Sequence, residues 1–257
     1  MKIIARFISI VCVLLAGIFN INAQEMDIQP DEVYLLIGQS NMAGRGVLDE
    51  KNTQVVSENI LMLDKDNKWV IAKNPLHFDK EFAGVGPGLS FAQKMLKNDK
   101  KNKIGLIPCA WGGSPINVWM PGAVYLNHKP YDEAIERAKI AMQTGRLKGI
   151  LWHQGESDNK HGQADVYLQK LQVLVANLRR DLNSPNLPFV AGEIGRFNTD
   201  NFINPVINMI YKEVSNSAVV SSEGLTDKGD HLHFDSVSAD ILGQRYAEAM
   251  NKLLKKN

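Results

Sequence analysis

The chain has 257 residues, a formal net charge of +1 and a hydrophobic fraction of 44 %. This length suits one α/β domain or two small ones, and the apolar fraction is sufficient for a buried core. The balanced charge gives no indication of nucleic acid, an anionic membrane or a polyanionic substrate as a partner, so a neutral small molecule or polymer is the expected ligand.

The first 23 residues have the pattern of a secretory signal peptide. Lys2 and Arg6 form a basic start, an apolar run covers residues 7–19, and Ala23 stands at a suitable cleavage point. The run is too short to favour a membrane span, and an uncleaved anchor is the alternative. We therefore expect residues 1–23 to be removed, the protein to be periplasmic or secreted, and no stable membrane insertion afterwards.

Strand and helix patterns alternate along the rest of the chain. Continuous apolar runs, typical of strands covered on both faces, occur at 33–37, 104–110, 149–153, 189–194 and, more weakly, 218–221. Helical patterns lie between or after them at 88–97, 130–144, 164–182 and 236–254, the last with Asp235 or Ser236 as its cap. Residues 48–83 carry mostly loop signals. The order predicts one domain over residues 24–257, with a parallel sheet of about five strands and helices on both faces.

Three of the predicted strands end in polar segments that contain glycine. These segments are Gly38–Asn41, Cys109–Ser114 and His153–Asp158. In open parallel sheets, ligands bind beyond the carboxyl ends of the strands, so the three segments are expected to form one site. Once residues 1–23 are removed Cys109 is the single cysteine, and since it ends an apolar run we expect a buried thiol rather than a nucleophile.

Ser40 and a D-x-x-H segment could supply nucleophilic chemistry at this edge. A serine alcohol needs a neighbouring base, and otherwise Ser40 is a turn residue that bonds the backbone. Asp230 and His233 are three apart, which lets the carboxylate reach ring Nδ1 and leaves Nε2 to take a serine proton. A metal site or a solvated loop is the alternative for this segment, whose neighbour His231 packs or faces solvent.

Acyl transfer also requires hydrogen-bond donors for the developing oxyanion. The candidates are the N–H of Ser40, a backbone N–H of Gly112 or Gly113, and the side-chain amide of Gln154. Glycine lets the backbone approach a ligand closely, although Gly112 and Gly113 could instead form an ordinary turn.

Four segments together resemble the SGNH-hydrolase superfamily, and more narrowly its carbohydrate O-acetylesterase branch of acetyl-xylan esterases and sialate O-acetylesterases. They are GQSNM at 38–42, WGGSPINVW at 111–119, WHQGESD at 152–158 and DHLHF at 230–234. The resemblance implies a flavodoxin-like three-layer α/β/α sandwich, no metal and no organic cofactor. It also implies Ser40 as nucleophile, His233 as base and Asp230 as its orienting acid. Gly112 or Gly113 would donate to the oxyanion with Gln154, which replaces the superfamily's usual asparagine.

Five further residues are candidates for substrate contact or for support of the site: Gln39, Asn41, Glu156, Trp119 and Arg45. Trp119 offers an aromatic face to a sugar ring or belongs to the core. Arg45 meets a sugar carboxylate such as that of sialic acid, or pairs with a nearby acid on the surface.

The expected activity is that of a serine esterase acting on an acetylated carbohydrate. Acetylated xylan or a related plant polysaccharide is the first expectation, and an O-acetylated sialic acid is the alternative. A non-catalytic carbohydrate-binding module is an alternative of another class, which the intact Ser40, Asp230 and His233 disfavour. A lipase is disfavoured because the strand ends are polar and no long apolar lid segment is visible.

Overall fold

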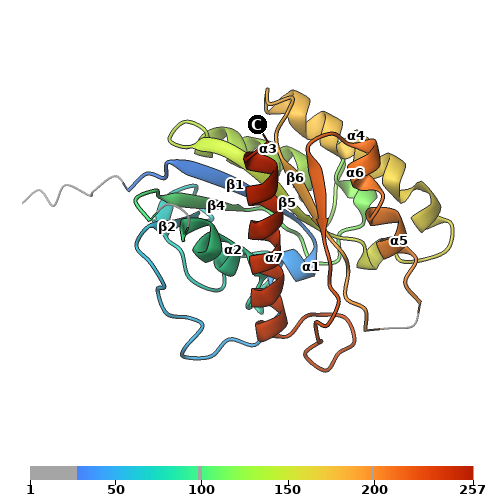
Figure 1. Ribbon diagram of the computed structural model, residues 1–257, viewed down its shortest axis with the longest axis horizontal. Coiled ribbons are helices and arrows are strands. Elements are labelled where there is room, and N and C mark those ends of the chain that lie inside the picture. The colour runs from blue at the N-terminus through green and yellow to red at the C-terminus, as the bar shows by residue number, and fades with distance from the viewer. Residues whose placement is uncertain (1–27, 98–99, 198–199, 257) are drawn as a thin grey trace, which may run out of the picture.

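The centre of the protein is a seven-stranded sheet in the order β3-β2-β4-β1-β5-β6-β7 (Figure 1). The computed structural model describes residues 28–97, 100–197 and 200–256. The strands are β1 (Glu32–Gly38), β2 (Ile60–Leu63), β3 (Trp69–Ile71), β4 (Ile104–Pro108), β5 (Arg146–His153), β6 (Phe189–Gly192) and β7 (Ser217–Val220). Neighbouring strands are parallel except β2 and β3, which pair antiparallel at one edge.

The predicted parallel sheet is confirmed, but the expected number of about five strands is too low. The two additional strands, β2 and β3, lie within residues 48–83, where loop signals dominate. They are four and three residues long, and such short strands show no readable periodicity.

The four predicted helices are present close to their expected ranges. They are α2 (Pro87–Leu96), α3 (Pro130–Ala141), α4 (Gln163–Asp181) and α7 (Ser236–Leu254), and the shorter α1 (Ser40–Ala43), α5 (Ile203–Ile207) and α6 (Ile210–Glu213) accompany them. Of the two predicted caps for α7, Asp235 is used: its side chain accepts a hydrogen bond from the N–H of Ser238.

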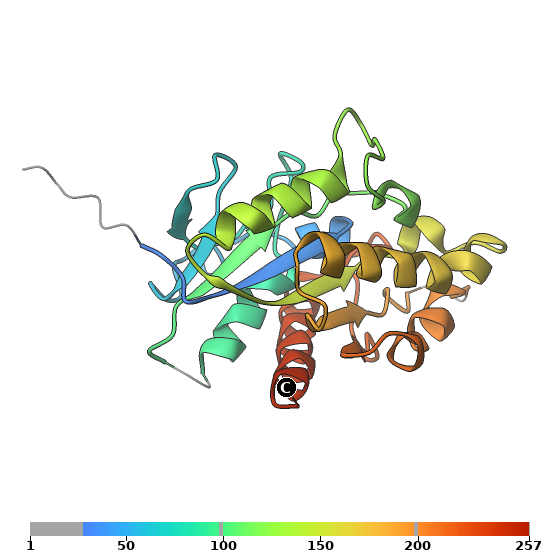
Figure 2. The ribbon, with the colours of Figure 1, turned by 90° about the horizontal axis from the view of Figure 1, so that it is seen from above.

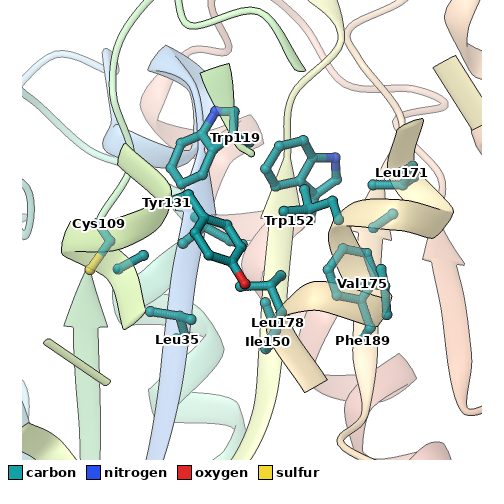
Figure 3. Packing of buried hydrophobic residues seen from close by; sticks show 14 of the residues in the cluster. Leu35, Cys109, Trp119, Tyr131, Ile150, Trp152, Leu171, Val175, Leu178 and Phe189 are labelled. Carbon is teal, nitrogen blue, oxygen red and sulfur yellow. The ribbon is translucent and has the colours of Figure 1, made fainter. Parts of the chain in front are cut away.

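Helices cover both faces of the sheet, which confirms the three-layer α/β/α arrangement. Successive side chains of β1 point to opposite faces, so that Leu35 and Ile37 join one hydrophobic cluster and Tyr34 and Leu36 join another. Helices α3, α4, α5 and α6 lie on one side of the sheet and α2 and α7 on the other (Figures 1 and 2). The first group contributes side chains to the first cluster and the second group to the second cluster. Figure 3 shows the first cluster, in which the Trp119 and Trp152 rings meet edge to face, 5.4 Å between centroids.

The carboxyl ends of β4, β1 and β5 lie side by side. Leu36 of β1 is level with Pro108 of β4, and Gly38 is level with His153 of β5. The three polar segments predicted from the sequence therefore leave the sheet at one edge. Gly38 is needed at this point because its φ is +132° and an added Cβ would overlap the carbonyl oxygen of His153.

Two further expectations concern the membrane and the cysteine. No helix within the described ranges is long and apolar enough to span a bilayer. The predicted signal peptide, residues 1–23, lies outside the described residues. Cys109 is buried as predicted, and burial raises the pKa of its thiol to about 11.

Candidate active site

Ser40, His233 and Asp230 lie in one hydrogen-bonded chain. Nε2 of His233 is 3.0 Å from Oγ of Ser40, and Nδ1 of the same ring is 2.7 Å from Oδ2 of Asp230. An ionised carboxylate can only accept, so Nδ1 carries the ring proton and Nε2 accepts from the serine hydroxyl. The structure thus brings together the three side chains that the sequence singles out.

The Asp230 carboxylate is held in its ionised form by its surroundings. Burial raises the pKa of this carboxyl, but the backbone N–H groups of His233 and Leu232 and the ring of His233 outweigh that effect. They hold the pKa well below its usual value. The carboxylate therefore fixes both the tautomer and the orientation of the imidazole at neutral pH.

Asn41 joins the turn that carries Ser40, here called the serine turn, to the backbone on both sides of His233. Its side-chain amide donates to the carbonyl of Leu232, 3.1 Å away, and to Oε1 of Glu156. Its amide oxygen accepts from the N–H of Phe234 at 3.1 Å. Because residues 232 and 234 flank the histidine, Asn41 holds the backbone that carries the His233 ring. The side chain of His231 is mostly exposed and lies 3.8 Å from the carboxylate of Asp227.

A cavity of about 350 Å³ opens beside the serine and the histidine. Its lining comes from the serine turn, the segments after β4 and β5, the loop that carries His233 (the histidine loop) and part of the region 48–83. The residues are Gln39, Ser40, Arg45, Lys80, Phe82, Gly112, Gly113, Glu156, Ser157, Leu232 and His233. Most of these side chains are polar or small, which suits a hydrophilic ligand.

The two glycines of the second segment differ in what their N–H groups do. The N–H of Gly112 donates to Oδ2 of Asp79 at 2.8 Å, so it is not free for a ligand. The N–H groups of Gly113 and Ser40 make no hydrogen bond with any residue that the structure describes. Gly113 has a φ of +76°, which glycine adopts without strain.

Gln154 points into the protein and not into the cavity, contrary to the expectation that it donates to the oxyanion. The residue is fully buried, and its Nε2 lies 2.6 Å from Oδ2 of Asp158 and 3.2 Å from Oε1 of Gln39. Its Oε1 accepts from the hydroxyl of Tyr167. The amide turns inward because these buried polar groups require partners.

Gln39, and not Gln154, lines the cavity. Oε1 of Gln39 accepts from the amide of Gln154 at 3.2 Å and from the backbone N–H of Ser157 at 3.3 Å. Its Nε2 has no hydrogen-bond partner among the described residues and is not sealed from solvent. Gln154 and Ser157 therefore orient the amide of Gln39 so that its N–H₂ group remains available.

Arg45 pairs with an acid, as one of the two expectations has it, but the pair is buried and not on the surface. Its Nη2 lies 2.7 Å from Oδ2 of Asp79, and the two side chains are 4 % and 1 % exposed. Asp79 therefore neutralises the guanidinium and also binds Gly112. The expectation that Arg45 meets a sugar carboxylate is weakened by this pairing.

Trp119 does not line the cavity: of its two expected places, against a sugar ring or in the core, the structure shows the core. The side chain is fully buried, its Nε1 donates to Oγ of Ser114 at 2.9 Å, and its ring packs against Trp152 (Figure 3). The ring packs into the core because the hydroxyl of Ser114 satisfies its N–H there.

Glu156 is a buried carboxyl at the edge of the cavity. Burial raises its pKa to about 7, and the hydrogen bond from Asn41 offsets this only in part. Its Oε2 has no partner within the described residues. Nε2 of His153 lies 3.7 Å from Oε1 of Glu156, but burial lowers the pKa of His153 to about 3, so this ring is neutral and the contact is not an ion pair.

Sequence reasoning missed the part of the site that comes from residues 48–83, namely Asp79, Lys80 and Phe82. No spacing or motif marks these residues. Among residues 28–97, 100–197 and 200–256 there is no group of three or more His, Cys, Asp or Glu side chains that could hold a metal ion.

Comparison with known proteins places the chain in a family. A sequence model described as "carbohydrate esterase, sialic acid-specific acetylesterase" matches residues 30–252. A probable carbohydrate esterase of Arabidopsis thaliana is 34 % identical over an alignment that covers 86 % of this chain and 91 % of the relative. The crystal structure of an Arabidopsis thaliana protein with the same identity covers 87 % of this chain and 99 % of its own, with a TM-score of 0.76.

More distant structures share the fold. The structure of NanS is 20 % identical, covers 90 % of this chain and 100 % of its own, and has a TM-score of 0.72. A carbohydrate acetylesterase from Xanthomonas citri is 18 % identical, covers 88 % of this chain and 57 % of its own, and has a TM-score of 0.70. From the family match and the Arabidopsis relative, we conclude that the chain is a carboxylic ester hydrolase and belongs to the family of carbohydrate esterases described as sialic acid-specific acetylesterases.

Proposed function

We propose that the protein is a serine esterase that removes O-acetyl groups from carbohydrates through an acetyl-enzyme intermediate. Oγ of Ser40 attacks the acetyl carbonyl while Nε2 of His233 takes its proton. The protonated ring then gives that proton to the sugar oxygen as its bond to the acetyl carbon breaks. Water, deprotonated by the same ring, then attacks the acetyl-enzyme, and the ring returns that proton to Oγ of Ser40 as the bond to the acetyl carbon breaks and acetate leaves.

One observation carries this proposal: the imidazole of His233 bridges Ser40 and Asp230 with contacts of 3.0 and 2.7 Å at the wall of a cavity. A serine that served only as a turn residue would not need an oriented base. The ionised Asp230 supports the proposal further, because it stabilises the imidazolium that forms when the serine loses its proton.

The donors to the oxyanion are the N–H groups of Ser40 and Gly113 and the side-chain amide of Gln39. All three belong to residues that line the cavity, and none of these donors is engaged with another described residue. Preorganised donors of this kind contribute about 3 kcal/mol each to the transition state. Gln154 acts through Gln39, whose Oε1 it holds.

Acetylated xylan or a related plant polysaccharide is the substrate that we propose first. The Arg45–Asp79 pair carries no net charge, which suits a neutral sugar. An O-acetylated sialic acid is the second candidate, which the description of the family favours and for which Lys80 would supply the cation. Acetate release from acetylated xylan and from O-acetylated sialoglycans separates the two, and Lys80→Ala should lower only the activity on the acidic sugar.

The experiment that tests the chemistry is the substitution Ser40→Ala. We expect hydrolysis of p-nitrophenyl acetate to fall by at least about 10³-fold while the melting temperature stays close to that of the wild type. A serine-reactive phosphonate should label the wild type and not the variant. Hydrolysis by the variant at a rate near that of the wild type would contradict the assignment of Ser40 as nucleophile.

We also propose that the protein is exported, on the pattern of residues 1–23. N-terminal sequencing of the protein recovered from its native cells should find a chain that starts near Gln24. A chain that keeps Met1 and remains with the membrane would contradict this proposal.

A further inference from the structure

We propose that Phe82 is the platform on which the sugar ring of the substrate stacks while its acetyl group reaches Ser40. This inference rests on the proposed function and adds the element that recognises the sugar. It concerns a residue that no sequence motif marks and that lies outside the four segments with chemical candidates.

Phe82 is an exposed aromatic ring at the wall of the cavity that holds the serine. Its side chain is 70 % exposed, and it lines the same cavity as Ser40 and His233. Aromatic rings with one open face are suited to stacking against a flat, partly apolar partner.

The segment that carries the ring is fixed against the serine turn. The N–H of Gly84 donates to the carbonyl of Gly44, and Gly46 and Val85 exchange two backbone hydrogen bonds. These contacts bind the residues just after Phe82 to those just after the nucleophile. The distance between platform and serine is therefore set by the backbone, and little ordering is required when a ligand binds.

Arg45 supports one face of the ring. Its guanidinium carbon lies 5.3 Å from the ring centroid of Phe82, and Asp79 holds the same guanidinium in a buried ion pair. A cation is attracted to the face of an aromatic ring, so the guanidinium of Arg45 helps to fix the orientation of the Phe82 ring. The exposed fraction of Phe82 leaves the opposite face to the ligand.

The wall of the cavity offers both apolar and polar contacts, as a sugar ring requires. Phe82 and Leu232 are the two large apolar side chains of the lining, and Lys80, Glu156 and Ser157 line the same cavity. A pyranose needs both kinds of contact, since its C–H face packs on an aromatic ring and its hydroxyl groups need polar partners.

The test compares two esters in each variant. For every protein, kcat/KM is measured on an acetylated xylo-oligosaccharide and on ethyl acetate, which has no ring to stack, and the ratio of the two values is taken. We expect Phe82→Ala to lower this ratio about tenfold. Phe82→Tyr and Phe82→Trp keep an aromatic face, so they should keep most of the ratio.

Phe78 provides a matched control. Its ring lies over another guanidinium, that of Arg137 at 5.0 Å, and is 45 % exposed, but it does not line the cavity of Ser40. Phe78→Ala should leave the ratio at the wild-type value. An unchanged ratio in Phe82→Ala, including the case in which both activities fall together, would overturn the platform and leave the proposed function intact. A wild type that releases acetate from neither ester would overturn both.

Discussion

Nε2 of His233 lies 3.0 Å from Oγ of Ser40 although 193 residues separate them in the chain. Two independent attachments produce this contact. Asn41 binds the backbone on both sides of His233, and Oγ of Ser236, at the start of α7, donates to the carbonyl of Val47 at 2.7 Å. The histidine loop is thus anchored to the serine turn before and after the imidazole, which leaves the ring little freedom to move away.

Asp230→Asn should reduce turnover without unfolding the protein. An amide can donate to Nδ1 and so favour the tautomer that places the proton on Nε2, where it blocks the acceptance of the serine proton. We expect kcat to fall by about 10²- to 10⁴-fold with a small change in KM. Steady-state kinetics on p-nitrophenyl acetate measure both.

Asp227→Asn is the control for this substitution. Asp227 accepts hydrogen bonds from the N–H groups of Gly229 and His231 in the same loop, and no contact with the ring of His233 is found among the described residues. Its substitution should affect the stability of the loop and reduce kcat far less. Equal losses in the two variants would mean that Asp230 only orders the loop.

Gln39→Glu should show whether the amide of Gln39 stabilises the oxyanion. The substitution keeps the acceptor for Gln154 and Ser157 and replaces the free N–H₂ group with an oxygen. We expect kcat/KM to fall by about 10²- to 10³-fold, because a donor is lost and negative charge is added beside the developing oxyanion. Gln39→Met, which removes the donor without adding charge, should lose less than Gln39→Glu. Activity near wild type in both variants would place the donor elsewhere.

Glu156→Gln should change how stability depends on pH. The pKa of Glu156 is raised to about 7 in the folded state from 4.5, so the folded protein binds more protons than the unfolded chain between these values. The stability contributed by the neutral carboxyl is fully present below pH 4.5 and is lost as the pH rises to 7. Relative to Glu156→Gln, the free energy of unfolding of the wild type should fall by about 3 kcal/mol between pH 4.5 and pH 8.

Urea unfolding of both proteins at pH 5 and pH 8 checks this expectation. The amide does not titrate, so the difference between the two free energies of unfolding isolates Glu156 from the other groups. A difference that is the same at both pH values would show that Glu156 is ionised throughout.

The sequence predicts the parallel sheet and its polar edge because both depend on local pattern. Runs such as residues 33–37 are apolar at every position, which is typical of a strand covered on both faces. Since ligands bind beyond the carboxyl ends of such strands, the end of this run points to Ser40. The D-x-x-H spacing likewise predicts the contact between Asp230 and His233 that the structure contains. The catalytic roles of these residues stay predictions.

The parts of the site that the sequence does not predict depend on contacts between distant segments. Asp79 binds Arg45 and Gly112, which come from two other loops, so no local spacing indicates it. The direction of Gln154 is decided by Asp158 and by Tyr167 of α4, which supply its partners inside the protein. Residue type alone does not distinguish such an amide from one that faces a ligand.

Trp119→Phe should test the placement of this ring in the core. The substitution leaves the buried hydroxyl of Ser114 without the indole N–H and leaves a void beside Trp152, so we expect a loss of about 1–3 kcal/mol in the free energy of unfolding. The kcat/KM on acetylated xylo-oligosaccharides should stay within about twofold of the wild type, because the ring does not reach the cavity.

Trp111→Phe is the matched control: Trp111 is partly exposed and stacks on His128, 4.0 Å between centroids, so its stability loss should be smaller. A variant of Trp119 with wild-type stability and impaired oligosaccharide hydrolysis would instead place this ring in contact with the sugar.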